Sequence, residues 1–158
     1  ELAINGPQIM QGYWNLPAAD AEVFIEHQGR KWLRTGDVAE IGADGFVEIV
    51  DRIKDMIAVG GFKVFPSQVE DVLQENPAIR DVLVIGVPDD YHGEMPRAYA
   101  TLQPDASPAP SAEALRDWLN ARVGKHERVD EVVIRKELPV TLVGKLDRKA
   151  LRQEVLGS

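Results

Sequence analysis

The sequence predicts an α+β fold, in which a small domain with a central β-sheet flanked by helices follows a β-rich segment. Three observations predict it. Residues 1–50 contain short alternating stretches and no convincing helix longer than a few turns. From about residue 51 onward, strand-like stretches alternate with amphipathic ones. The 158 residues, 44% of them hydrophobic, are enough for one full core or two small ones.

Short strands account for the first part of the chain. Their predicted ranges are 1–5, 31–34, 38–41 and 46–50. Asp44 and Gly45 separate the last two and favour a hairpin turn. The chain opens inside a strand pattern without an initiator methionine, so we expect it to be a fragment of a longer protein.

The second part contains three predicted helices. Ser67 and Glu70 have the spacing of a capping box at the start of the first helix, and Asn76-Pro77 would end it. Asp147 is the expected N-cap of the third. The second helix is predicted from a core-facing stripe formed by Leu115, Trp118, Leu119 and Val123.

A strand is predicted at residues 62–66, ahead of these helices, and three more among them, at residues 82–87, 97–103 and 131–136. The polar residues 89–96 would connect the first two strands. A Pro/Ala/Ser stretch at 104–110 is expected to be a loop rather than a linker between domains. Together these elements form a domain of ordinary size.

Composition excludes several classes of function. A net charge of −8 argues against nucleic-acid binding, which needs a clustered basic surface. The absence of cysteine removes disulfide and thiol chemistry, and the three histidines lack the spacing of a zinc site, so no metal ligand is predicted. We expect neither a transmembrane segment nor a signal peptide, which makes the cytoplasm the default location.

The stretch WLRTGD, at residues 32–37, is the first of three polar motifs. Gly36 permits a tight turn, and the carboxylate of Asp37 can accept two hydrogen bonds from vicinal hydroxyls such as those of a ribose. The alternative is an aspartate whose carboxylate only accepts hydrogen bonds from the amides of its own turn.

The second motif, DRIKDMIAVGGFKVFPSQVE, occupies residues 51–70. Arg52 offers a fork of donors that suits a ribose or a phosphate. Gly60 and Gly61 leave room for a ligand to pass close to the backbone. Both features have plainer interpretations, since alternating charges are typical of a solvated strand and paired glycines of a hairpin turn.

The third motif, PVTLVGKLDRKAL, places Lys145 after a glycine and just before the last helix. Its ammonium is a compact positive charge on a flexible stem, which suits a phosphoryl oxygen. An exposed lysine at a helix start is the alternative, although the helix dipole favours anions rather than cations at that end.

In this order, the three motifs and the opening ELAINGPQIMQGYWN resemble the adenylate-forming enzymes, which include acyl-CoA synthetases, luciferases and the adenylation domains of peptide synthetases. The resemblance covers essentially the whole chain. GGFKVFPSQVE is most similar to acyl-CoA ligases that act on medium- or long-chain fatty acids. Residues 1–50 would then be the end of a large N-terminal domain, 51–55 the hinge and 56–158 the mobile C-terminal domain.

The resemblance also implies roles for single residues. Asp37 and Arg52 would bind the ribose of ATP, and Lys54 would be the hinge. Gly60 and Gly61 would line the path of the pantetheine arm of coenzyme A. Lys145 would be the catalytic lysine of the adenylation step.

The implied substrates are a fatty acid, ATP and coenzyme A, with Mg²⁺ bound mainly by a missing N-terminal part. The chain lacks the family's phosphate loop and its aromatic-Gly-x-Thr-Glu segment, so the fragment alone is expected to be inactive. Two alternatives remain: an adenylation module that serves a carrier protein, and a non-catalytic interaction domain. Exposed strand edges without their partner domain also predict self-association of the fragment.

Overall fold

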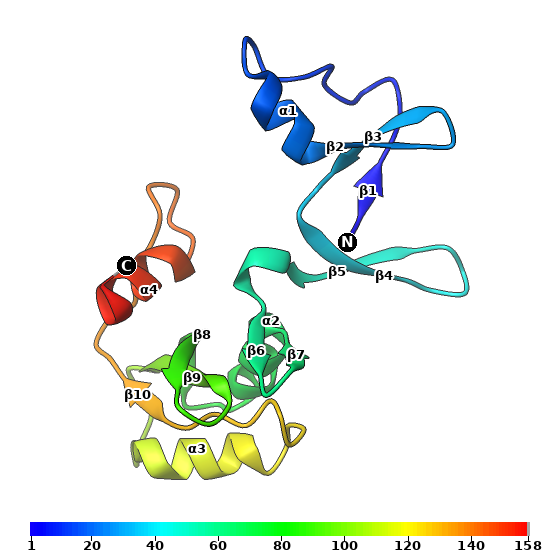
Figure 1. The fold of residues 1–158 in the computed structure, drawn as a ribbon. Helices are drawn as coiled ribbons and strands as arrows, with labels where there is room; N and C mark the ends of the chain where they lie inside the picture. Colours follow the sequence, from blue (N-terminus) through cyan, green and yellow to red (C-terminus); the bar gives the residue numbers. More distant parts are fainter. Residues whose placement is uncertain (158) are drawn as a thin grey trace. The chain divides into compact units, whose positions relative to one another are not determined.

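The computed structural model describes residues 1–157 of the chain (Figure 1). The chain divides into two compact units, Glu1–Lys54 and Asp55–Ser158. Each unit has its own sheets.

The first unit contains two small antiparallel sheets. One has the strand order β1-β3-β2, built from Ala3–Ile4, Arg30–Arg34 and Phe24–His27. The other is the hairpin of β4 (Asp37–Ile41) and β5 (Val47–Arg52), which confirms the predicted hairpin. The 3-10 helix η1 (Ile53–Asp55) follows β5.

A short helix, α1 (Pro17–Val23), and strand β2 were not predicted. Pro17 stands in the first turn of α1, where its missing N–H costs no hydrogen bond. The helix has no buried residue, so it lacks the apolar stripe by which an amphipathic helix is recognised.

A five-stranded sheet forms the centre of the second unit. Strands β8 (Ile79–Asp89) and β9 (Gly93–Leu102) make a long antiparallel hairpin, and β10 (Val132–Ile134) pairs in parallel with β9. The hairpin of β6 (Ile57–Val59) and β7 (Phe62–Val64) pairs with the start of β9. This confirms the predicted central sheet.

The connection predicted at residues 89–96 is wrong in extent, because β9 begins at Gly93. The carboxylate of Asp89 accepts hydrogen bonds from the backbone amides of Tyr91 and His92, at 3.0 and 2.7 Å. These bonds hold a tight turn between β8 and β9. The polar residues after the turn therefore pair with β8, as Glu94 does with Pro88, instead of forming a connection.

Helices cover both faces of this sheet, as Figure 1 shows for α3 and α4. Helices α2 (Pro66–Gln74) and α3 (Ala112–Asn120) pack on one face, where their Leu73, Leu115 and Leu119 are fully buried with Val82 and Val84. Helix α4 (Arg148–Leu156) packs on the other face, where Leu151 joins a second cluster that includes Leu83, Ile85 and Val87. The residues of β8 from Val82 to Val87 thus alternate between two cores, which is why this stretch of the strand is continuously apolar.

The ends of the helices test the capping predictions. Asp147 is the N-cap of α4, since its carboxylate accepts a hydrogen bond from the amide of Ala150 at 2.9 Å. The predicted capping box of α2 is wrong, because this helix begins at Pro66 after Phe65. The carboxylate of Glu70 instead accepts from the amide of Val84 in β8.

Candidate functional site

Lys145 lies on a tight turn, residues 139–147, which we call the Lys145 loop. The amide of Thr141 donates to the Lys145 carbonyl at 2.7 Å, and the amide of Gly144 donates to the Thr141 carbonyl at 2.9 Å. The Thr141 hydroxyl accepts from the Lys145 amide at 3.2 Å. Gly144 has a φ of 78°, which a glycine adopts without the usual steric cost. The backbone on both sides of Lys145 is therefore fixed.

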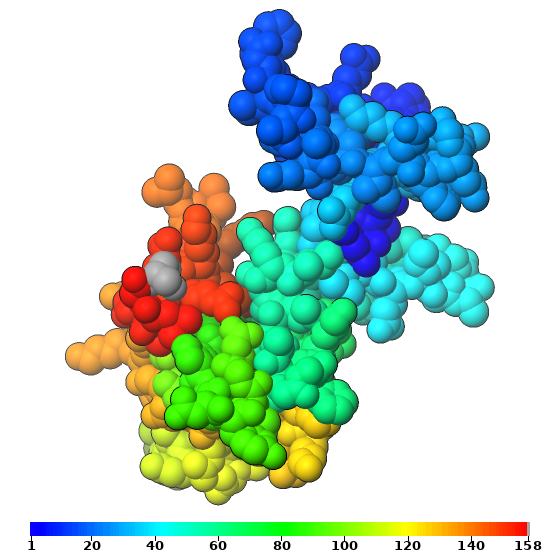
Figure 2. Space-filling view, in the orientation of Figure 1, coloured from blue at the N-terminus to red at the C-terminus, as the bar shows by residue number. Residues whose placement is uncertain are grey.

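The side chains of this loop point into solvent. In Figure 2 it stands out, in orange, from the surface of the second unit. Leu142 is fully exposed, and Val140 and Val143 are mostly exposed. Lys145 is exposed too, and its ammonium forms no ion pair with any residue of 1–157. The loop thus presents an unpaired cation among apolar side chains on a hydrogen-bonded turn.

Asp37 and Arg52, the two residues predicted to bind a ribose, lie together in the first unit. They are partners across the β4–β5 hairpin, and Asp37 Oδ1 lies 2.8 Å from Arg52 Nε. The hydroxyl of Thr35 accepts a hydrogen bond from the Asp37 amide, and the carboxylate of Asp37 is turned toward Arg52. Among residues 1–157, the Asp37 carboxylate therefore accepts no hydrogen bond from the backbone amides of its own turn.

Arg52 also lines an open hollow of about 250 Å³ on the first unit, together with Gly36 and Lys54. Lys54 lies in η1 and is the last residue of this unit. Its side chain is exposed. The hinge role of Lys54 remains a prediction.

Gly60 and Gly61 form the turn of the β6–β7 hairpin in the second unit. Their φ angles are 55° and 88°, as a tight two-residue hairpin requires. A Cβ atom on Gly61 would meet nothing within 4 Å, so this glycine serves the backbone conformation rather than a close contact. The plain interpretation, a hairpin turn, is therefore correct, and the pantetheine path remains a prediction.

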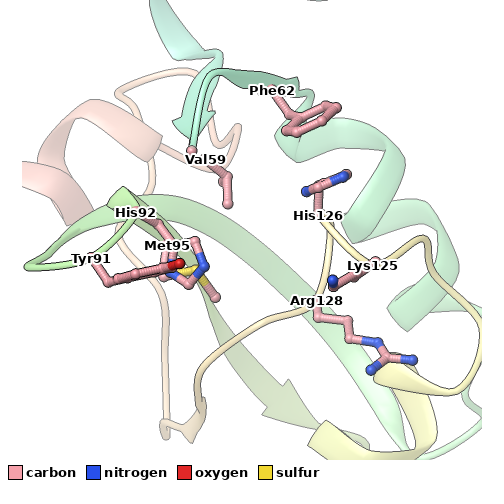
Figure 3. A pocket seen from close by; sticks show the side chains of 9 residues that line it. Val59, Phe62, Tyr91, His92, Met95, Lys125, His126 and Arg128 are labelled. Carbon is pink, nitrogen blue, oxygen red and sulfur yellow. The ribbon is translucent and has the colours of Figure 1, made fainter.

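A pocket of about 540 Å³ opens beside Gly60 (Figure 3). Residues of the segment after α3 contribute three basic side chains, Lys125, His126 and Arg128. The ring of Phe62 stacks on that of His126, with 3.5 Å between centroids and 13° between planes. Tyr91, His92 and Met95, from the β8–β9 hairpin, lie across the pocket. We call this hollow the basic pocket.

Lys125 and Arg128 are exposed, and neither forms an ion pair within the described part of the chain. Two unpaired cations beside stacked rings suit a ligand that carries phosphates and a flat base. Of this pocket, the sequence prediction named only Gly60. The residues that line it come from three separate segments, and no local pattern joined Gly60 to Lys125, His126 and Arg128.

Neither a metal centre nor a membrane span is found in the residues that the structure describes. Among them, no three histidine, aspartate or glutamate side chains gather as a metal site would require. None of the helices in residues 1–157 is both long and apolar enough to cross a bilayer.

Comparison with known sequences finds one family and many relatives. Residues 68–145 match the family described as the AMP-binding enzyme C-terminal domain. The chain is 43% identical over 157 residues to the medium/long-chain-fatty-acid–CoA ligase of Mycobacterium tuberculosis, covering 96% of this chain and 27% of that protein. It is 39% identical over 154 residues to the long-chain-fatty-acid–CoA ligase of Bacillus subtilis, covering 98% of this chain and 26% of that protein. The chain thus spans about a quarter of the length of these relatives.

Solved structures agree in fold. ATP-bound MatB from Rhodopseudomonas palustris has a TM-score of 0.85 at 27% identity, covering 95% of this chain and 29% of that one. The o-succinylbenzoate CoA synthetase of Bacillus subtilis, in complex with its acyl-adenylate intermediate, has a TM-score of 0.80 at 32% identity, covering 95% and 29%. From its sequence relatives and its fold, the chain belongs to the family of adenylate-forming acyl-CoA ligases and contains the C-terminal domain of that family.

Proposed function

We propose that the whole protein to which this chain belongs is an AMP-forming ligase that joins a fatty acid to coenzyme A. In this proposal the chain supplies the lysine of the first half-reaction and contacts to coenzyme A in the second. The observation that carries the proposal is the presentation of Lys145, a free cation on a loop whose backbone is fixed by hydrogen bonds.

In the first half-reaction, a carboxylate oxygen of the fatty acid attacks the α-phosphorus of ATP, and the bond to pyrophosphate breaks. Negative charge accumulates on the oxygens around that phosphorus. The Lys145 ammonium would stabilise this charge and would hold carboxylate and phosphate together against their repulsion. Asp37 would accept hydrogen bonds from the ribose hydroxyls of ATP, with Arg52 beside it.

In the second half-reaction, the thiol of coenzyme A attacks the carbonyl carbon of the acyl-adenylate. A thioester forms, AMP leaves with the electrons of the broken acyl–phosphate bond, and the thiol proton is released. The thiol must reach the carbonyl that Lys145 approached in the first step, so the lysine must withdraw. Rotation of the second unit about Lys54 would allow this, since few backbone dihedrals suffice for a hinge.

The basic pocket supports coenzyme A as the acyl acceptor. Lys125 and Arg128 would bind its phosphates, and the Phe62–His126 stack offers a flat surface to its adenine. The pantetheine arm would leave the pocket past Gly60, which lines it. A carrier-bound pantetheine has a single phosphate and no adenine, so this pocket favours free coenzyme A over a carrier protein.

The test separates the two half-reactions in the whole protein. Lys145→Ala should lower the rate of acyl-adenylate formation roughly 100-fold or more, as removal of a transition-state donor does. Thioester formation from supplied acyl-adenylate should change less than about threefold, because Lys145 has then withdrawn. Lys136→Ala is the matched control, since Lys136 is another exposed lysine of the same unit. If Lys145→Ala leaves both half-reactions unchanged, Lys145 is an ordinary surface lysine and the proposal fails.

A further inference from the structure

Arg148, the first residue of α4, forms a network of ion pairs inside the second unit. One guanidinium nitrogen, Nη2, lies 2.7 and 2.8 Å from the two carboxylate oxygens of Glu70 in α2. The other, Nη1, lies 3.3 Å from Oδ2 of Asp55. The side chains of all three residues are at most 23% exposed. The network is thus largely shielded from water, and its charge-assisted hydrogen bonds are specific in geometry.

This network joins parts of the chain that the proposed mechanism uses. Arg148 follows the Lys145 loop directly, because Asp147 closes the loop through a 2.8 Å bond to the Pro139 carbonyl and also caps α4. Asp55 follows Lys54, the predicted hinge. Glu70 is fixed in turn, since the amide of Val84 donates to it at 2.7 Å. The base of the loop is therefore tied to the start of the second unit and to its central sheet.

An arginine is better suited than a lysine to tie the base of the loop to two carboxylates. Its planar guanidinium presents two nitrogens to separate carboxylates, and so it fixes an orientation as well as a distance. A buried ion pair adds little net stability, because the desolvation of both charges offsets their attraction. Such a network can therefore contribute precise placement of the Lys145 loop rather than stability.

We propose that Arg148 is a positioning residue for the adenylation step, holding the Lys145 loop in a fixed place relative to Asp55 and Glu70. This inference rests on the proposed function of Lys145. A shift of the loop by about 1 Å would misplace the Lys145 ammonium, and misplacements of this size lower rates by roughly 100-fold. The thioester step, for which Lys145 withdraws, does not depend on this placement.

The proposal is tested with Arg148→Gln and Arg148→Lys in the whole protein. Arg148→Gln should lower the rate of acyl-adenylate formation at least about tenfold and leave thioester formation from supplied acyl-adenylate within about threefold of the parent. Arg148→Lys should recover part of the rate, since it keeps the charge and loses the fork. If Arg148→Gln does not fold, the smaller change Arg148→Lys alone decides, with an expected loss of at least about threefold confined to the first step.

Arg152→Gln is the matched control, because Arg152 anchors the same helix through Glu94 at 3.2 Å but, within the described residues, forms no ion pair with Asp55 or Glu70. It should leave both half-reactions within about threefold of the parent. Glu70→Gln, which keeps an acceptor for Val84, should reproduce the Arg148→Gln defect, and the double variant should be no worse than the more affected single variant. Independent, additive losses would contradict the proposed network.

Amide hydrogen exchange in the 158-residue chain gives a readout besides activity. Arg148→Gln should speed exchange at the amides of Thr141 and Lys145 about tenfold, and Arg152→Gln should not. A proportional loss in both half-reactions, or unchanged exchange in the loop, would show a merely structural role and overturn the inference. If Lys145→Ala has no effect on adenylation, the proposed function itself has failed, whereas a normal Arg148→Gln beside a defective Lys145→Ala refutes only the positioning role.

Discussion

Asp37 and Arg52 face each other across the β4–β5 hairpin, and a 2.8 Å contact joins Oδ1 of the first to Nε of the second. The other carboxylate oxygen of Asp37, Oδ2, has no hydrogen-bond donor within residues 1–157. The ion pair therefore orients the carboxylate and leaves one oxygen available for a ligand.

We expect Asp37→Asn to raise the KM for ATP in the whole protein roughly 10- to 100-fold, since hydrogen bonds to a charged group are worth about 1.5–3 kcal/mol. Initial rates of pyrophosphate release over a range of ATP concentrations measure this. Glu48→Gln is the control, because Glu48 is an exposed carboxylate on the same hairpin. An unchanged KM for Asp37→Asn would rule out the ribose role.

The sequence predicted the main elements of the second unit because their patterns are local. Residues 82–87 of β8 are apolar since both faces of the strand are buried there, and Asp147 caps α4 through an amide only three residues away. The capping box at Ser67 and Glu70 failed for the opposite reason. Glu70 binds partners 14 and 78 residues away, Val84 and Arg148, and no local pattern reveals such contacts.

The same distinction applies to the candidate sites. Motifs that are continuous in sequence, such as the Lys145 loop and the Gly60-Gly61 turn, could be located before the structure was known. The basic pocket could not, because Phe62, His92 and Lys125 approach one another only through the pairing of β6 with β9 and the path of the chain after α3. Assembly in three dimensions, rather than residue type, defines that site.

The basic pocket predicts a selective defect in the use of coenzyme A. We expect the double variant Lys125→Gln/Arg128→Gln to raise the KM for coenzyme A at least about tenfold, because two charge-assisted contacts to phosphate are lost. The rate of acyl-adenylate formation should stay within about twofold of the parent. Steady-state thioester synthesis and pyrophosphate release measure the two quantities. Arg116→Gln, on the exposed surface of α3, is the control, and an equal effect on both steps would exclude the pocket as a coenzyme A site.

Asp89 predicts a pH dependence of stability in the second unit. Hydrogen bonds from the backbone amide of His92, then of Tyr91, lower the pKa of its carboxyl below the usual 3.8. A lowered pKa in the folded state means that the carboxylate stabilises the fold above pH 3.8 and that this contribution is lost as the pH falls through the folded value. The difference in stability between the parent chain and Asp89→Asn should therefore be largest near neutral pH and shrink below pH 3.8. Denaturant unfolding followed by the NMR signals of the second unit tests this, and a difference independent of pH would contradict it.

The β4–β5 hairpin predicts self-association of the 158-residue chain. Ile41, Phe46, Val47 and Ile49 are all about half or more exposed on this hairpin, and Phe46 is 78% exposed. Apolar patches of this kind promote association. Light scattering should show a mean mass that rises with concentration, and Phe46→Lys should reduce the rise. A strictly monomeric chain at every concentration would refute this prediction.

Leu151 and Leu142 offer a matched pair of leucines for a test of the core. Leu151 is 0% exposed, in the cluster between α4 and β8, whereas Leu142 is fully exposed on the Lys145 loop. Leu151→Ala should lower the free energy of unfolding of the second unit by about 2–5 kcal/mol, because it removes buried methyl groups and leaves a cavity. Leu142→Ala should change it by less than about 0.5 kcal/mol. Denaturant midpoints at neutral pH measure both values. Equal effects of the two substitutions would mean that α4 does not pack on the sheet as described. The position of the Lys145 loop, which α4 follows directly, would then need to be revised.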